Sequence, residues 1–138
     1  MKKFLFYLLS FTWGLPMTFC GLIVAAILLL AGHKPKKWKY CYYFEVGRNW
    51  GGLELGAFFL VNKNSSTYIK NHEHGHAIQN CWFGPFFPFI VAIPSAIRYW
   101  WRELLTKCGK TDLPDYDSIW FEGQATRIGT KLVEKIKR

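Results

Sequence analysis

The feature that most restricts the fold of this chain is a long uncharged stretch near its N-terminus. Residues 4–33 form a run of 30 positions without Asp, Glu, Lys or Arg. A helix of about 20 apolar residues already spans the hydrocarbon core of a bilayer, and the apolar core of a signal peptide is shorter than this run. We therefore predict a transmembrane anchor over residues 1–33, with Gly14 and Pro16 kinking it or dividing it into two unequal pieces.

At 138 residues the chain is long enough for one domain and too short for two. Hydrophobic residues make up 51% of the chain and aromatic residues 19%, which is typical of an integral membrane protein. Most of the basic residues behind the net charge of +9 flank apolar segments or end a helix, so the predicted partner is anionic lipid and not nucleic acid. Four lysines follow the uncharged run and two precede it, which favours a cytoplasmic location for the domain.

Two segments rich in aromatic and β-branched residues follow the anchor. Residues 38–46 and 52–61 are separated by residues 47–51, which begin and end with glycine, and this pattern predicts a β-hairpin. Alternation along the second segment puts its apolar side chains on one face, with Glu54 and Gly56 on the other. The apolar set is Leu53, Leu55, Ala57, Phe59 and Val61. An exposed arm of the hairpin can pair with an extended peptide, or both arms can simply cover a helix, and the sequence leaves both alternatives open.

A helix and an apolar segment come next. The helix is predicted to begin near Ser66, a residue suited to cap it, and to end at Gly84-Pro85. Residues 83–101 are strongly apolar, but three prolines and Arg98 interrupt them. This pattern favours an interfacial or re-entrant segment over a second membrane crossing.

The last part of the chain predicts a polar loop and a final helix. The loop covers residues 103–117, and Asp117 or Ser118 can cap a helix over residues 119–137. The predicted fold class is therefore an α+β membrane protein. Its elements are an N-terminal transmembrane helix, a short β-hairpin, the helix that begins near Ser66, an interfacial apolar segment and a C-terminal helix.

The helix after Ser66 carries the pattern His-Glu-x-x-His, at His72, Glu73 and His76. A spacing of four puts the two imidazoles on one face of a helix, one turn apart, where they can bind a single zinc ion. Glu73 then lies beside that face, placed to accept a proton from a metal-activated water. His74 points roughly to the opposite side and is therefore a poor ligand.

A catalytic zinc site needs three protein ligands and one open position. The candidates for the third ligand are Glu122, Cys41, Cys81, Asp115 and Asp117. Glu122 fits best, because a helix would hold it rigidly and small neighbours would let another helix approach closely. Those neighbours are Gly123, Ala125 and Gly129. The alternative for Glu122 is an ordinary exposed glutamate of a solvated helix.

The string His-Glu-His-Gly-His at residues 72–76, followed by Glu122 on a later helix, resembles the gluzincin branch of zinc metallopeptidases. This resemblance implies that the first and last histidines of the string and Glu122 bind zinc, and that Glu73 is the general base. It also implies a minimal, membrane-anchored catalytic domain of this type over residues 34–138.

Two further patterns bear on the resemblance. Many gluzincins place an aspartate after the zinc-binding glutamate to brace a histidine, whereas this chain has Thr126 one turn on. The local string His-Glu-x-Gly-His-Ala also resembles the site-2 intramembrane proteases. Their second motif, an Asp-Gly on a later transmembrane helix, is not evident in this sequence, so this resemblance ranks second.

The expected activity is hydrolysis of peptide bonds in peptides or membrane-protein tails, at the cytoplasmic surface of the membrane. Two alternatives belong to other classes. In one, zinc only joins helices in a non-catalytic membrane protein, and a fourth ligand from Cys41 or His74 would support this alternative. In the other, a small basic membrane protein binds anionic lipid or a partner helix, and its histidines have no metal-binding role.

Overall fold

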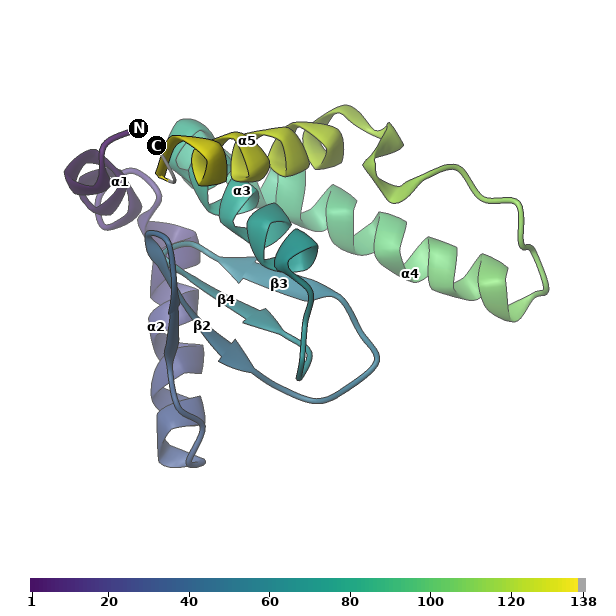
Figure 1. The fold of residues 1–138 in the computed structure, drawn as a ribbon, viewed down its shortest axis with the longest axis horizontal. Coiled ribbons are helices and arrows are strands. Elements are labelled where there is room, and N and C mark those ends of the chain that lie inside the picture. Colours follow the sequence, from purple (N-terminus) through teal and green to yellow (C-terminus); the bar gives the residue numbers. More distant parts are fainter. Residues whose placement is uncertain (137–138) are drawn as a thin grey trace.

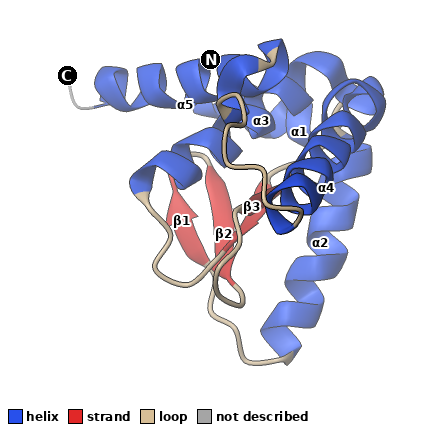
Figure 2. Cartoon of the chain, turned by 90° about the vertical axis from the view of Figure 1, so that its right-hand side faces the viewer, coloured by secondary structure: helices blue, strands red, loops and turns tan. Residues whose placement is uncertain are grey.

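The computed structural model describes residues 1–136, with side chains as far as Lys131. It is an α+β structure, in which helices surround a small four-stranded sheet (Figure 1, Figure 2). The helices are α1 (Lys3–Ser10), α2 (Leu15–Leu30), α3 (Thr67–Phe83), α4 (Ile93–Lys107) and α5 (Trp120–Ile136). The strands are β1 (Lys36–Trp38), β2 (Cys41–Glu45), β3 (Gly52–Leu55) and β4 (Phe58–Val61). Short helical turns are η1 (Gly84–Phe86), η2 (Pro88–Ala92) and η3 (Tyr116–Ser118).

The uncharged N-terminal stretch forms two helices of unequal length, α1 and α2, which are bent by 88° relative to each other. Gly14 precedes the first residue of α2, and Pro16 lies in its first turn, where a missing backbone N–H costs no helical hydrogen bond. The side-chain amide of Asn80 in α3 donates to the Gly14 carbonyl oxygen at 3.2 Å. The predicted division of this stretch at Gly14 and Pro16 is confirmed.

Within residues 1–136, no single helix has both the length and the apolar character needed to cross a bilayer. Two pairs of helices reach that length and apolarity together, and each pair contains a sharp bend. The first pair is α1 with α2. In the second pair, α3 and η1 form one arm, η2 and α4 form the other, and the arms are bent by 118°. The bend of the second pair lies between Phe86 and Pro88, within the segment 83–101 that the sequence predicts as interfacial or re-entrant.

The sheet has the strand order β1-β2-β4-β3, and its central strands β2 and β4 are parallel. The predicted hairpin between residues 38–46 and 52–61 is therefore wrong. Each segment folds back on itself instead, so that β1 pairs with β2 and β3 pairs with β4, both antiparallel. Lys39 and Gly56 make these turns with positive φ angles of 52° and 72°, which is the backbone conformation of tight hairpin turns.

The turn at Gly56 also changes which side chains share a face. The register places Glu54 opposite Phe59, and directly opposite residues of two strands lie on the same face. Phe59 packs in the core between the sheet and α3, so Glu54 is on that buried face as well. Leu55 packs on the other side, against α2. The prediction that Leu53 and Leu55 share a face with Phe59 is therefore wrong.

Helix α3 runs through the middle of the molecule, between the sheet and α5 (Figure 1). Its predicted ends are confirmed: the Ser66 hydroxyl accepts from the Ile69 backbone N–H at 3.3 Å, and Gly84 follows the last residue with a φ of 53°. Every residue from Asn71 to Cys81 is buried. Several of its polar side chains have partners in neighbouring elements. They are those of Asn71, His72, Gln79 and Asn80.

The polar loop predicted over residues 103–117 is shorter than expected, because α4 continues to Lys107. Residues 102–107 are good helix formers, and the helix stops only before Gly109, which has a φ of 84°. Helix α5 begins at Trp120, one residue after the predicted start, and the predicted last residue, Lys137, lies outside the described residues.

Helices α3 and α5 approach each other closely at two glycines. A Cβ atom on Gly75 would overlap the backbone of Ala125, and one on Gly129 would overlap the backbone carbonyl of Asn71. The prediction that small residues on the last helix permit close approach is confirmed at Ala125 and Gly129. This contact brings the first turn of α5 over the histidines of α3.

Gly129→Ala should therefore destabilise the protein, although alanine is the better helix former by about 1 kcal/mol. The added methyl group must push the two backbones apart, and such overpacking costs about 1–3 kcal/mol. Urea denaturation of purified protein measures the change in the free energy of unfolding. Thr130→Ala, at the exposed next position, is the matched control and should change stability by less than about 0.5 kcal/mol. An increase in stability for Gly129→Ala would contradict the close contact.

Candidate metal centre

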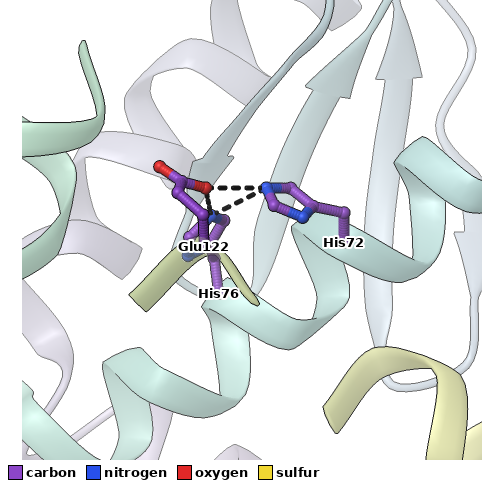
Figure 3. Close-up of side chains that lie close together, drawn as sticks. All are labelled: His72, His76 and Glu122. Carbon is purple, nitrogen blue, oxygen red and sulfur yellow. Dashed lines mark hydrogen bonds and ion pairs between the residues drawn. The ribbon is translucent and has the colours of Figure 1, made fainter. Parts of the chain in front are cut away.

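Three side chains from two helices converge beside the middle of α3 (Figure 3). His72 and His76 are one turn apart on α3, and Glu122 lies in the first turn of α5. The two Nε2 atoms are 3.0 Å apart, and Oε2 of Glu122 lies 3.0 Å from Nε2 of His72 and 3.1 Å from Nε2 of His76. All three residues are buried. The structure thus brings together the three residues that the sequence predicts as ligands, and together they can hold a metal ion.

The geometry and charge of this group suit a cation. Ligand atoms about 2.1 Å from a tetrahedrally coordinated metal are about 3.4 Å apart, which is close to the observed triangle with sides of 3.0 and 3.1 Å. The second carboxylate oxygen of Glu122, Oε1, is buried without a hydrogen-bond partner. In the described part of the chain no lysine or arginine pairs with Glu122, and buried carboxylates need a positive partner.

The protonation of Glu122 follows from the same contacts. Burial by itself would raise the pKa of its carboxyl group, but hydrogen bonds with His72 and His76 outweigh burial and hold the pKa well below its usual range. Glu122 is therefore a carboxylate, which is the form that binds metals.

His72 is oriented by a chain of hydrogen bonds. The Thr126 hydroxyl lies 2.8 Å from Nδ1 of His72 and donates its own proton to Oδ2 of Asp117, also at 2.8 Å. The hydroxyl oxygen must therefore accept from Nδ1–H, so Nε2 is the nitrogen that would bind a metal once it gives up the proton that it shares with Glu122. Thr126 thus connects the Asp117 carboxylate to His72 through two hydrogen bonds. Asp117 makes no close contact of its own with this histidine, since its Oδ1 is 3.9 Å from Nδ1.

His76 is oriented by Gln79 in the next turn of α3. Nδ1 of His76 lies 2.7 Å from Oε1 of Gln79. The amide group of Gln79 is itself fixed, because its Nε2 donates to the Phe121 carbonyl oxygen at 2.9 Å and to Oε1 of Gln124 at 2.8 Å. Nδ1 of His76 then carries a proton, and Nε2 is the nitrogen that would bind a metal in place of its hydrogen bond with Glu122. Such outer hydrogen bonds fix the tautomer of metal-binding histidines.

Thr126→Val should weaken the binding of added Zn²⁺ by about 10–100-fold, since loss of an outer partner of a ligand has effects of that size. Valine has nearly the same shape but cannot connect Nδ1 of His72 to Asp117. Competition with a chromophoric chelator measures the dissociation constant. The control is Thr130→Val on the exposed side of the same helix, which should leave the constant unchanged. Equal affinity in both variants would show that the relay does not orient the histidine.

Glu73 lies between the histidines and the edge strand of the sheet. Its side chain packs against Gly52 of β3, where a Cβ atom would overlap its carboxyl group. Burial raises the pKa of Glu73 to about 7, with His76 lowering it and Glu122 raising it further. A carboxyl group with a pKa near 7 can both accept and return a proton at neutral pH.

A cavity of about 440 Å³ opens over this group. His72, Glu73 and His76 line it from α3, whereas Glu122 does not. Its other walls come from the loop before β3, from β3 itself, and from η2, α4 and η3. A molecule in this cavity would therefore meet the two imidazoles on the same side as Glu73.

The other candidate ligands lie elsewhere. Cys41 and Cys81 are buried in the apolar core between the sheet and α3, and Asp115 is exposed at the start of η3. Asp117 contacts the site through Thr126 and is not among the three converging residues. The structure therefore brings Glu122, and none of these alternatives, to the two histidines.

His74 points away from the site, as predicted. Its ring packs against the rings of Phe6 and Tyr40, with centroid distances of 6.1 and 5.5 Å. Burial lowers the pKa of His74 to about 3, with a further contribution from Lys39. A neutral histidine between two aromatic rings does not provide a fourth ligand to the metal centre, and neither does the buried Cys41.

Glu54 is a second carboxyl group in the cavity, and the sequence gives no sign of its burial. Its Oε1 accepts a hydrogen bond from the Gly56 backbone N–H, while Oε2 is buried without a partner. Burial raises the pKa of Glu54 well above its usual value; the Gly56 N–H opposes this rise, and Glu73 adds to it. Glu54 therefore keeps its proton to a higher pH than an exposed glutamate does.

Because the pKa of Glu54 is raised in the folded state, its ionisation lowers the free energy of unfolding as the pH rises. Below the unfolded pKa of about 4.3 the group is protonated in both states, and the cost appears as pH rises above that value. Glu54→Gln removes this titration but keeps an acceptor for Gly56. We expect the variant to unfold at a higher temperature than the unmodified protein at pH 8, with a smaller gain at pH 5. A difference that does not depend on pH would contradict the raised pKa of Glu54.

The sequence does not predict the contacts that orient the histidines. Asp117 and Thr126 are nine residues apart and belong to η3 and α5, so their meeting depends on how the chain turns into the last helix. Gln79 carries a local signal, because it stands three residues after His76 and lies on the same face of α3.

Comparisons with known proteins found no matching family model, no similar curated protein and no similar solved structure. The residues of the site and their geometry therefore carry the functional assignment.

Proposed function

We propose that this chain is a membrane-bound zinc metallopeptidase. The observation that carries the proposal is the convergence of two histidine Nε2 atoms and one carboxylate oxygen, which lie within 3.1 Å of one another. The two histidines line a cavity together with Glu73. Two imidazoles and one carboxylate are a common ligand set of catalytic zinc, which keeps its fourth position for water or substrate. The resemblance of the His-Glu-x-x-His string and Glu122 to gluzincins supports the same assignment.

Each residue of the site has a role in this proposal. His72, His76 and Glu122 hold the metal, which when bound acts as a Lewis acid that lowers the pKa of water and polarises a carbonyl group. Glu73 accepts the proton of the attacking water and then donates it to the nitrogen of the leaving amine. The pKa of about 7 that burial gives Glu73 suits both steps, because the proton must be taken up and released at the same pH.

The position of β3 supports a peptide as the substrate. β3 is an edge strand, and Gly52 and Leu53 line the cavity next to Glu73. A free edge can pair with an extended peptide through main-chain hydrogen bonds. Such pairing would hold a peptide bond along the cavity, within reach of the metal and of Glu73.

Exposed apolar side chains support membrane attachment. On α1 and α2 they include Phe4, Phe19, Ile23, Ile27 and Leu30, which are 48–91% exposed. Contiguous apolar surface of this kind is rare on soluble monomers, and lysines flank it in the sequence. We propose that α1 and α2 attach the protein to the cytoplasmic leaflet, whose anionic lipids attract basic residues. Resistance of the full-length protein to extraction from membranes by alkaline carbonate tests this attachment.

Metal analysis and peptide hydrolysis together test the enzymatic proposal. Full-length protein purified in detergent should contain one equivalent of zinc and hydrolyse peptides from a fluorogenic library. Removal of zinc with 1,10-phenanthroline should abolish hydrolysis, and added zinc should restore it. Absence of bound metal would overturn the metal centre itself. One equivalent of zinc without hydrolysis of any peptide would favour the non-catalytic alternative, in which zinc only joins α3 to α5.

A further inference from the structure

We propose that the cavity beside the metal centre receives its substrate from the lipid phase, as an apolar segment of a membrane-embedded polypeptide that enters across α4. This inference rests on the proposed function and narrows it to one class of substrate. Four features of the cavity and of α4 carry it: the lining, the outer face of the helix, the residues shared between the two, and the charges nearby.

The cavity offers a substrate apolar surface and no positive charge. Among the residues that the structure describes, no lysine or arginine lines it, although the chain contains 18 of them. Its walls away from the metal centre are mostly aromatic or aliphatic, and they include Trp50, Ile69, Phe87, Val91 and Tyr99. At its rim, Leu53 is 47% exposed and Trp100 is 68% exposed. The substrate residues that fit this surface are therefore apolar.

Helix α4 forms one wall of the cavity and also carries an apolar stripe on its outer face. The stripe has the three- and four-residue spacing of a single helix face. Its members are Ile93, Ile97, Trp100, Trp101 and Leu104. All five are exposed, and together with Ala96 they line a second, shallow groove. Within the described residues, nothing covers this face.

The cavity and the outer groove meet at two residues. Ala96 and Trp100 line both of them, so the apolar surface continues from the outer face of α4 to the site. The side chain of Ala96 is small, so it offers little steric barrier between the groove and the cavity. Helix α4 and the loop between β2 and β3 extend to the same side of the molecule (Figure 1), and residues of that loop line the opposite wall. An apolar segment that leaves the outer face can therefore reach Glu73 without passing a basic side chain.

The charges around α4 identify the bilayer as the phase that covers its outer face. Lys107 and Lys110 are exposed at the C-terminal end of the helix, where they complement anionic headgroups. Trp100 and Trp101 are of the type that gathers at the membrane interface. Arg98 and Arg102, by contrast, are half-buried and donate to the backbone carbonyls of residues 114–116, where the loop enters η3. The helix thus has an apolar face outward and its arginines on another side, which is the amphipathic division of helices that lie in the membrane interface.

Photo-crosslinking tests the route without depending on turnover. Zinc-loaded Glu73→Gln protein, with Leu53 replaced by p-benzoyl-phenylalanine, is reconstituted in phosphatidylethanolamine–phosphatidylglycerol liposomes. One probe is a single-span Leu-Ala helix with lysine ends, embedded in the same liposomes. The other is a water-soluble amphipathic peptide of equal length. We expect at least 10-fold more capture of the embedded helix.

Two sets of substitutions locate the entry. Ile97→Ser, Trp101→Ser and Leu104→Ser together should reduce capture of the embedded helix at least 5-fold. The control, Phe4→Ser with Leu8→Ser, removes exposed apolar side chains from α1 and should leave capture unchanged. Capture is expressed per reconstituted molecule, and bound zinc of one equivalent shows that each variant is folded.

The outcomes separate this inference from the proposed function. Equal or better capture of the water-soluble peptide, or unchanged capture in the triple variant, would overturn entry from lipid and would favour a soluble partner for the stripe. Zinc-dependent hydrolysis of library peptides by the unmodified protein would still stand in that case. If the unmodified protein hydrolyses no peptide, the proposed function fails, and the inference that rests on it fails too.

Discussion

Glu73→Gln is expected to abolish peptide hydrolysis while leaving the metal bound. Loss of a general base lowers rates by about 10²–10⁴-fold, which corresponds to about 3–5.5 kcal/mol of transition-state stabilisation. Glutamine keeps the shape of the side chain and its packing against Gly52, but it cannot accept a proton. The measurement pairs the rate of hydrolysis of a fluorogenic peptide with the zinc content of the same sample.

Glu45→Gln is the matched control for this experiment. Glu45 lies on β2 and pairs with Lys36 at 2.8 Å, so its substitution should leave the rate within about 2-fold. A Glu73→Gln protein that retains zinc and full activity would show that another group takes the proton. A variant that loses zinc would place Glu73 in the support of the metal centre and leave its catalytic role without evidence.

The second large effect is expected at Glu122, the ligand that comes from the other helix. Glu122→Gln should weaken Zn²⁺ binding by more than about 100-fold, because even loss of an outer partner costs 10–100-fold. At a zinc concentration 1,000 times the dissociation constant of the unmodified protein, binding stabilises the fold by about 4 kcal/mol. The variant should gain less than about 1.4 kcal/mol at the same concentration. Chemical denaturation with and without zinc measures both gains.

The control for Glu122 is Asp112→Ala in the exposed loop after α4, which should keep the full stabilisation by zinc. A variant that still gains about 4 kcal/mol from zinc would exclude Glu122 as a ligand. The site would then have only two known protein ligands, and the proposal that the protein is an enzyme would lose its main support.

The parts of the fold that the sequence predicts correctly are those set by local chemistry. Ser66 caps α3 through its hydroxyl group, Gly84 ends the helix with a positive φ, and Gly14 with Pro16 divides the N-terminal stretch. Each of these depends on the backbone preference or hydrogen-bonding capacity of one or two residues. Such preferences act within a few positions and can be identified without the rest of the chain.

The sheet shows where local chemistry is insufficient. Residues 52–61 alternate as one strand should, yet a turn at Gly56 divides them, and β4 pairs in parallel with β2. A glycine within an alternating segment fits both a strand and a tight turn. Tertiary packing decides between a strand and a turn, because Phe59 must face α3 on one side of the sheet while Leu55 faces α2 on the other.

The candidate metal centre combines both kinds of information. The four-residue spacing of His72 and His76 places their side chains on one face of α3 in any helix, so the sequence by itself determines this half of the site. Glu122 is 46 residues from His76, and it reaches the histidines only because Gly75 and Gly129 let two helix backbones touch. Tertiary structure alone also decides that Asp117 supports His72 through Thr126 and that Glu54 is buried beside Glu73. Spacing within a helix is fixed by its 3.6-residue period, whereas contacts between elements depend on which surfaces bury the most apolar area against each other.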